Sequence, residues 1–155
     1  MVVGPQFCFV YGTLKRGQAN HHLIAAAVRS ATPATIHGRL YDVGPFPALA
    51  EGDDAVRGEL LLIEPTELAR VLAILDDLEG YAPSDPTGSI YLRRVVAAAT
   101  DDGREVAAHA YFYNRDTAAL CHLPAGEWHG PSAAEVATVS EELSLFGRHV
   151  RDFRR

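Results

Sequence analysis

The sequence predicts one α+β domain, in which a small, mostly antiparallel sheet of five or six strands is curled or closed into a barrel and flanked by helices. Strand-like apolar runs recur between turn residues over much of the 155-residue chain. Only two or three segments have helical spacing, too few to alternate with every strand as a doubly wound parallel sheet requires. A chain of this length can bury one core, so we expect a single domain over residues 1–155.

The chain opens with a strand, a loop and a helix. Gln6–Tyr11 is an apolar run of strand length, and Gly12–Gly17 is a loop bounded by glycines. Ala19–Val28 is then expected to form a short helix.

Four further strands are expected, at Thr35–Val43, Val56–Ile63, Ile90–Thr100 and Glu105–Tyr113. Gly44–Pro47 holds two prolines, which exclude it from a central strand, so we expect the sheet to be interrupted there. Asp101–Gly103 joins the last two strands with a sequence typical of a hairpin turn.

A helix is predicted over Pro65–Glu79, because Pro65 suits a first helical turn and Gly80 a stop. Its apolar face consists of Leu68, Val71, Leu72, Leu75 and Leu78. Since each residue advances by about 100° around the axis, Glu79 lies only about 20° from Leu68 and Leu72. The helix therefore turns a carboxylate toward the core.

The same geometry places Asp77 nearly opposite the apolar face and Asp76 on its flank, so we expect only Glu79 to point inward. Desolvation would raise the pKa of Glu79 and suit it to accept and donate a proton near neutral pH. Two alternatives stay open. The helix could fray at Gly80 and release Glu79 to solvent, or Glu79 could pair with a buried arginine such as Arg93.

The last part of the chain predicts one more helix, over residues 131–155. Ser132–Glu135 is a capping-box sequence, and apolar residues then recur at spacings of three and four, namely Val136, Val139, Leu143, Phe146 and Val150. We favour a terminal helix packed on the domain, and the alternative is a homodimer formed through this helix.

Composition excludes several function classes. A net charge of −6 argues against nucleic-acid binding, and the sequence lacks the roughly 20 consecutive apolar residues that cross a bilayer. We see no secretory signal and expect a cytoplasmic protein. Cys8 is expected to be buried and reduced. The seven histidines lack the spacing of metal ligands, so no zinc site is expected.

The loop that begins at Tyr11 is the second candidate for chemistry. Gly12 has no side chain and can take a positive φ, so the N–H groups that follow could converge on a carboxylate or carbonyl oxygen. Gly12 and Gly17 match the outer glycines of a phosphate loop, but Gln18 and Ala19 stand where lysine and serine or threonine are required. A nucleoside triphosphate site is therefore excluded, and an ordinary tight turn remains the alternative.

Three segments taken together resemble the γ-glutamylcyclotransferase-like family, most closely its γ-glutamylamine cyclotransferase and AIG2-like bacterial branch. These are Phe9–His21, Gly38–Gly44 with Pro47–Leu49, and Leu75–Tyr81. The resemblance runs from about Phe7 to Tyr113. It implies a barrel-like sheet flanked by helices, a catalytic Glu79, and a substrate cradle made of Tyr11, Gly12, Thr13 and Leu14. Members that act on γ-glutamyl amino acids carry Ser-Asn-Leu in this loop, so Thr13-Leu14 favours γ-glutamyl amines.

The reaction that the resemblance implies is cyclisation of a small γ-glutamyl substrate to 5-oxoproline with release of an amine, and it requires no cofactor. Glu79 would serve first as base and then as acid. Tyr113 is a candidate polar contact in the pocket, or else a core or rim tyrosine. Trp128 could cover the pocket or anchor the tail. The rival function is a non-catalytic module that binds small carboxylates or a partner protein.

Overall fold

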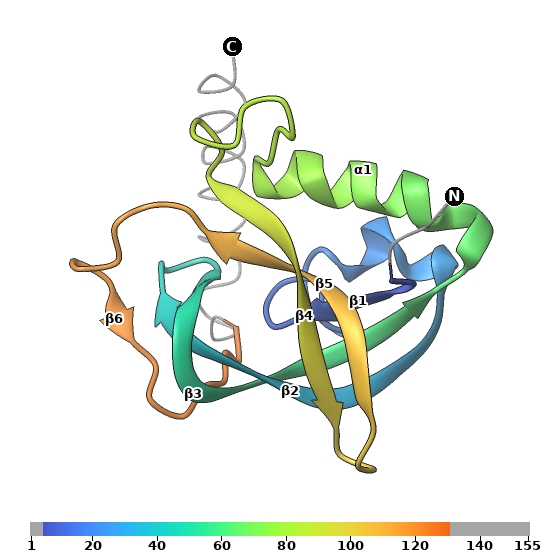
Figure 1. Cartoon of the computed structure of the whole chain (residues 1–155), viewed down its shortest axis with the longest axis horizontal. Helices are drawn as coiled ribbons and strands as arrows, with labels where there is room; N and C mark the ends of the chain where they lie inside the picture. Colours follow the sequence, from blue (N-terminus) through green and yellow to red (C-terminus); the bar gives the residue numbers. More distant parts are fainter. Residues whose placement is uncertain (1–4, 131–155) are drawn as a thin grey trace.

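The computed structural model describes residues 5–130, and in these residues the sheet closes into a five-stranded barrel (Figure 1). Its strands are β1 (Phe7–Val10), β2 (Val28–Asp42), β3 (Pro47–Ile63), β4 (Tyr91–Thr100) and β5 (Glu105–Tyr113). The order around the barrel is β3-β1-β5-β4-β2, and pairing of β2 with β3 closes it. A short sixth strand, β6 (Cys121–His122), adds to β2. The predicted α+β class is confirmed.

The predicted antiparallel character is also correct. Within the described part of the chain, every strand pair is antiparallel except β1 with β5, where Cys8 lies beside His109. Because β1 joins antiparallel β3 on one side and parallel β5 on the other, it is the strand that seals the barrel.

The β2–β3 hairpin is longer than its apolar runs suggest. β2 has 15 residues and β3 has 17, and they pair from Val28 opposite Ile63 to Asp42 opposite Pro47. The expected interruption at Gly44–Pro47 is only a turn, in which the Val43 N–H donates to the Phe46 carbonyl at 3.1 Å. Pro47 itself opens β3 beside this turn. Strand pairing thus extends through polar residues that the sequence pattern left outside the strands.

The predicted helix from Pro65 is confirmed. A 3₁₀ turn, Pro65–Glu67, leads into α1 (Leu68–Glu79), which buries Leu68, Val71 and Leu75 against the barrel. Gly80 ends the helix with a φ of +67°, a left-handed conformation that a residue with a side chain adopts only at a cost. The stop therefore falls directly after Glu79.

The helix expected over Ala19–Val28 is wrong. The structure has two 3₁₀ turns instead, at His21–Leu23 and Ala25–Ala27, held by bonds between residues three apart such as Ile24 N–H to the His21 carbonyl at 3.1 Å. Val28 already belongs to β2. Pairing of that strand with β3 takes the residues that a longer helix would need.

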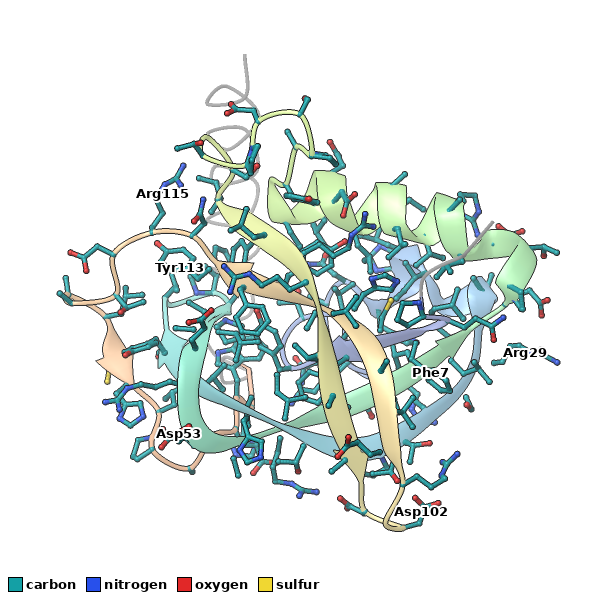
Figure 2. All side chains as sticks on the ribbon, in the orientation of Figure 1. Phe7, Arg29, Asp53, Asp102, Tyr113 and Arg115 are labelled. Carbon is teal, nitrogen blue, oxygen red and sulfur yellow. The ribbon has the colours of Figure 1, made fainter. Side chains whose placement is uncertain are left out.

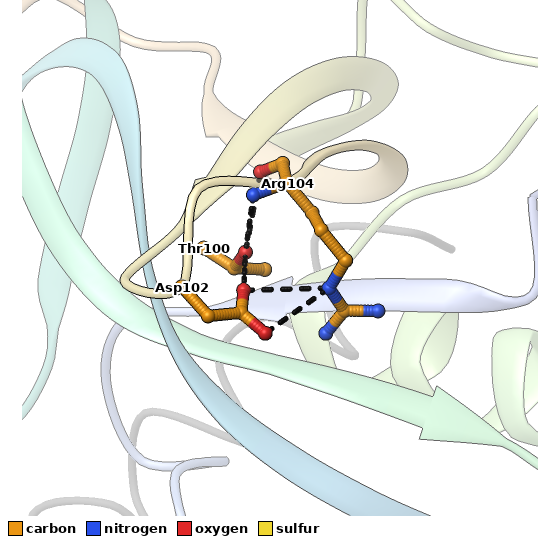
Figure 3. A network of polar contacts seen from close by, with 3 residues as sticks. All are labelled: Thr100, Asp102 and Arg104. Carbon is orange, nitrogen blue, oxygen red and sulfur yellow. Dashed lines mark hydrogen bonds and ion pairs between the residues drawn. The ribbon is translucent and has the colours of Figure 1, made fainter.

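The hairpin between β4 and β5 turns where Asp-Asp-Gly predicts it. Figure 3 shows how its tip is held: Thr100 Oγ1 donates to the Asp102 carboxylate and accepts from the Arg104 N–H at 3.0 Å. The bond from Thr100 is the main cause that lowers the pKa of Asp102. Asp102 and Tyr113 lie at opposite ends of this hairpin, so the turn is remote from the end where the helix lies (Figure 2).

Two apolar clusters divide the core. One fills the barrel and includes Phe9, Leu40 and Trp128, and the other packs the outside of β1 against α1 and includes Cys8, Val10 and Leu75. Cys8 is fully buried, as expected, and burial raises its pKa to about 12. Successive residues of β1 pack alternately into the two clusters. The loop after β1 therefore begins where the two clusters meet.

The C-terminal helix predicted over residues 131–155, and a homodimer formed through it, lie outside the described residues. Within residues 5–130, no helix combines the length and the apolar character that crossing a bilayer requires.

Candidate active site

A cavity of about 640 Å³ opens at the junction of the two clusters. Its walls come from the loop after β1, the turn before β3, the helix α1, the start of β4 and the end of β5 near Tyr111. The residues that line it include Tyr11, Gly12, Thr13, Leu14, Pro47, Leu78, Glu79, Tyr91 and Tyr111. The structure thus brings Glu79 and the predicted loop into one cavity.

Glu79, the last residue of α1, is partly buried in this cavity. Burial raises the pKa of its carboxyl group from 4.5 to about 7, since desolvation disfavours the charged form. The helix does not fray before it, because the N–H groups of Gly80 and Tyr81 bond to the carbonyls of Asp77 and Asp76. Among residues 5–130, no group donates a hydrogen bond to this carboxyl group, so it is free to accept one from a ligand.

Asp76 corrects the expectation that Glu79 alone points inward. Its side chain is only 15% exposed, lies 3.5 Å from the Arg93 guanidinium, and accepts the Tyr111 hydroxyl hydrogen bond at 2.5 Å. Arg93 therefore pairs with Asp76 and not with Glu79. A side chain on the flank of a helix can still point toward the sheet when strand residues of that sheet supply a cation and a hydroxyl group that bind it.

Three buried tyrosines surround the Glu79 carboxyl group: Tyr11, Tyr91 and Tyr111. Burial is the main cause that raises the pKa of each phenol, and the charge of Glu79 raises it further. Each hydroxyl donates elsewhere. Tyr11 bonds to the Tyr111 carbonyl at 2.5 Å, Tyr91 to the Pro47 carbonyl at 2.9 Å, and Tyr111 to Asp76.

The Tyr11–Leu14 loop forms the opposite wall. Gly12 does not have a positive φ; it is required for a different reason, because a Cβ there would stand 2.7 Å from the Pro47 ring carbons. Thr13 is fixed by Asn20, whose side-chain amide donates to Oγ1 at 3.0 Å and whose N–H donates to the carbonyl at 2.9 Å. Leu14 is buried in the core cluster under α1 and also lines the cavity.

Backbone donors are available in this loop. Within the described chain, the N–H groups of Gly12, Thr13 and Leu14 have no protein acceptor. Unpaired N–H groups next to a cavity are suited to bind a carboxylate or an oxyanion.

Trp128 packs beside this loop. It is 5% exposed, and its ring carbon Cε3 lies 3.9 Å from the place where a Gly12 Cβ would stand. The Lys15 ammonium donates to its carbonyl at 2.7 Å. Trp128 therefore anchors the loop from the barrel side.

Tyr113 stands apart from the other predicted residues. It is not among the residues that line the cavity, and its ring packs edge-on against Tyr91 at 5.4 Å between centroids. Its contact with the cavity is through Tyr91.

Tyr91 and Tyr111 line the cavity but were not predicted as site residues. Both fall inside strands that were correctly predicted, but an apolar run gives no sign of which tyrosines meet a helix. Among residues 5–130, no three His, Cys, Asp or Glu side chains gather as they would around a metal ion.

Comparison with known proteins identifies the family. The sequence model of the γ-glutamyl cyclotransferase, AIG2-like family matches residues 8–130. The chain belongs to this family. The resemblance drawn from three short segments is thereby confirmed.

Relatives of this γ-glutamyl cyclotransferase, AIG2-like protein occur in bacteria. One from Vibrio cholerae is 39% identical over 71 residues, which are 45% of this chain and 61% of that protein, so the chain spans less than two thirds of its length. The γ-L-glutamyl-butirosin B γ-glutamyl cyclotransferase of Niallia circulans is 32% identical over 109 residues, 70% of this chain and 67% of that enzyme.

A crystal structure of an AIG2-like protein from Mus musculus has the same fold. It is 22% identical, with a TM-score of 0.55, and the match covers 84% of this chain and 99% of that chain.

Proposed function

We propose that this protein is a γ-glutamylamine cyclotransferase, which converts a γ-glutamyl amine into 5-oxoproline and the free amine. One observation carries the proposal. The Glu79 carboxyl group, which has a pKa of about 7 and no hydrogen-bond donor among residues 5–130, lies in the same cavity as the Gly12–Leu14 loop, whose N–H groups have no acceptor among those residues.

In the proposed reaction, the Glu79 carboxylate takes a proton from the α-ammonium group of the substrate. The amine nitrogen then attacks the γ-carbonyl carbon of the same molecule, and the new C–N bond closes a five-membered ring. Glu79 gives this proton to the leaving nitrogen as the original amide C–N bond breaks. It then carries the second proton of the ring nitrogen to the released amine, which leaves 5-oxoproline with one N–H and the amine in its ammonium form. Proton transfer in both directions requires a base whose pKa lies near neutral pH, as that of Glu79 does.

The loop would supply binding and charge stabilisation. The N–H groups of Gly12, Thr13 and Leu14 would hold the substrate carboxylate or the developing oxyanion. Tyr11 and Tyr91 would shape the cavity around the folded substrate, and Tyr113 would support Tyr91. Because nucleophile and electrophile belong to one molecule, holding the curled conformer provides much of the acceleration. The reaction needs no cofactor, and we expect it to take place in the cytoplasm.

The test is a screen of γ-glutamyl amines and γ-glutamyl amino acids for release of 5-oxoproline, with kcat/KM measured from pH 5 to 9. We expect turnover of one or more amines, with kcat/KM falling about tenfold per pH unit below about 7 as Glu79 is protonated. Glu79→Gln keeps the shape but cannot accept a proton, so its kcat should fall by about 10²–10⁴-fold.

Glu105→Gln is the matched control, because Glu105 is an exposed glutamate at the start of β5, outside the cavity. Full activity of Glu79→Gln would refute the proposed role. If no γ-glutamyl compound is turned over while glutamate-like ligands still raise Tm, the protein is a non-catalytic binding module.

A further inference from the structure

The three phenols around Glu79 would be strong donors to a carboxylate, yet the protein directs all three hydroxyls to other acceptors. For Tyr11 and Tyr91 the acceptor is a backbone carbonyl of Tyr111 or Pro47. For Tyr111 it is the Asp76 side chain, at 2.5 Å. Asp76 is therefore the acceptor that a substitution can remove.

Asp76 and Glu79 are three residues apart on α1, and side chains at this spacing are neighbours on a helix surface. The Tyr111 hydroxyl lies at Asp76, and its ring lines the cavity that holds Glu79. A phenolic O–H favours two orientations in the plane of its ring and can turn from one to the other, so the acceptor that is present decides which one it takes.

Resting on the proposed function, we propose that Asp76 is a positioning residue: it holds the Tyr111 hydroxyl away from Glu79, so that no phenol donates to the carboxylate that serves as the base. A donor to the ionised carboxylate would stabilise it and weaken it as a base. Asp76 therefore preserves the basicity that burial gives to the Glu79 carboxylate.

The charges around Asp76 fit this role. Arg93 from β4 lies 3.5 Å from the Asp76 carboxylate, and a carboxylate is a better acceptor than a neutral group. The other titratable groups that face Asp76 are Cys8 on β1 and His109 on β5, both buried. Those that line the cavity with Glu79 are Tyr11, Tyr91 and Tyr111, together with Arg70 and Asp77 of α1. Asp76 is thus the side-chain acceptor of the Tyr111 hydroxyl.

The experiment follows the titration of the Glu79 carboxyl carbon by ¹³C NMR in the full chain, with Glu79→Gln used to assign its signal. In Asp76→Asn, the neutral amide is a weaker acceptor, so the Tyr111 hydroxyl can turn toward Glu79, directly or through one water. We expect the Glu79 midpoint, and the acid limb of kcat/KM, to move down by about one pH unit. The plateau value of kcat should fall several-fold.

Tyr111→Phe distinguishes this mechanism from a simple loss of negative charge. Without the hydroxyl, Asp76→Asn should leave the Glu79 midpoint where it stands in Tyr111→Phe alone. An equal downward shift in both backgrounds would overturn the proposal, because removal of a nearby negative charge also favours ionisation of Glu79. The proposal would also be overturned if an Asp76→Asn variant that folds, as judged by circular dichroism, showed no shift of the Glu79 midpoint.

The NMR titration keeps the two proposals separable. If no γ-glutamyl compound is turned over, the midpoint of Glu79 still reports whether Asp76 controls Tyr111. If turnover occurs and the midpoint does not respond to Asp76, the proposed function stands and the positioning role fails.

Discussion

At the scale of single residues, the site depends on the partly buried carboxyl group of Glu79, to which no group in the described part of the chain donates a hydrogen bond. Most buried carboxylates are stabilised by a cation or by hydrogen bonds, which lower the pKa. Arg93 and the Tyr111 hydroxyl could have done so here, but both are bound to Asp76. Glu79 is left in a state that reduces stability and suits proton transfer.

This state predicts how stability depends on pH. The pKa of Glu79 is higher in the folded protein, about 7, than its unperturbed value of 4.5, so the unfolded chain releases this proton first as pH rises. The contribution of Glu79 to stability is therefore complete below about pH 4.5, declines as pH rises toward 7, and stays low above. Glu79→Gln should remove this decline.

We expect the effect of Glu79→Gln on the free energy of unfolding to be more stabilising at pH 8 than at pH 4.5, by about 1–3 kcal/mol. Urea unfolding of the wild-type protein and of Glu79→Gln at the two pH values measures this difference. An effect that is the same at both pH values would show that Glu79 titrates alike in the folded and unfolded chain.

At the scale of elements, α1 is the part that sequence reasoning predicted best. Its apolar spacing and its Gly80 stop fix both ends and the direction of Glu79. The same reasoning failed for Ala19–Val28, which forms two 3₁₀ turns and whose last residue, Val28, already pairs with Ile63 in the sheet. It also failed for Asp76 and the tyrosines, because their positions depend on strands that are distant in sequence. Periodicity predicts which way a side chain points, but not what it meets.

Gly80→Ala tests the helix stop. A side chain at a φ of +67° is strained, so we expect a loss of about 1 kcal/mol in unfolding free energy. Because Glu79 precedes this position directly, kcat should fall more than the small loss of stability explains. Gly103→Ala is the control: its φ is +91° and its Cβ would meet nothing within 4 Å, in a turn remote from the cavity. Equal effects on kcat would contradict a role for the stop in placing Glu79.

At the scale of the whole molecule, the two walls of the cavity belong to different layers. Glu79 comes from the helix outside the barrel, whereas the Tyr11–Leu14 loop is held by Pro47 and Trp128. The barrel core and the helix packing must both be intact for the walls to face each other.

Trp128→Ala tests this dependence. Removal of a side chain that is 5% exposed in the barrel core should lower the free energy of unfolding by about 3–5 kcal/mol and raise KM through the loosened loop. Trp128→Phe keeps an aromatic ring there, so its unfolding free energy should fall less and its KM should rise less. Because Trp128 is the one tryptophan of the chain, circular dichroism must replace tryptophan fluorescence as the probe. A KM unchanged in Trp128→Ala would show that the loop holds its shape without this support.

The parallel pairing of β1 with β5 has a consequence for the order of folding. The hydroxyl bond from Tyr11 to the Tyr111 carbonyl joins residues 100 positions apart, so a growing chain cannot complete it until nearly all of the barrel has been synthesised. Contacts of such long sequence separation form late, since closing the intervening loop costs entropy. The cavity is therefore assembled in the last steps of folding, and a partly folded chain, however much of its hairpins it has formed, has no place to bind a substrate.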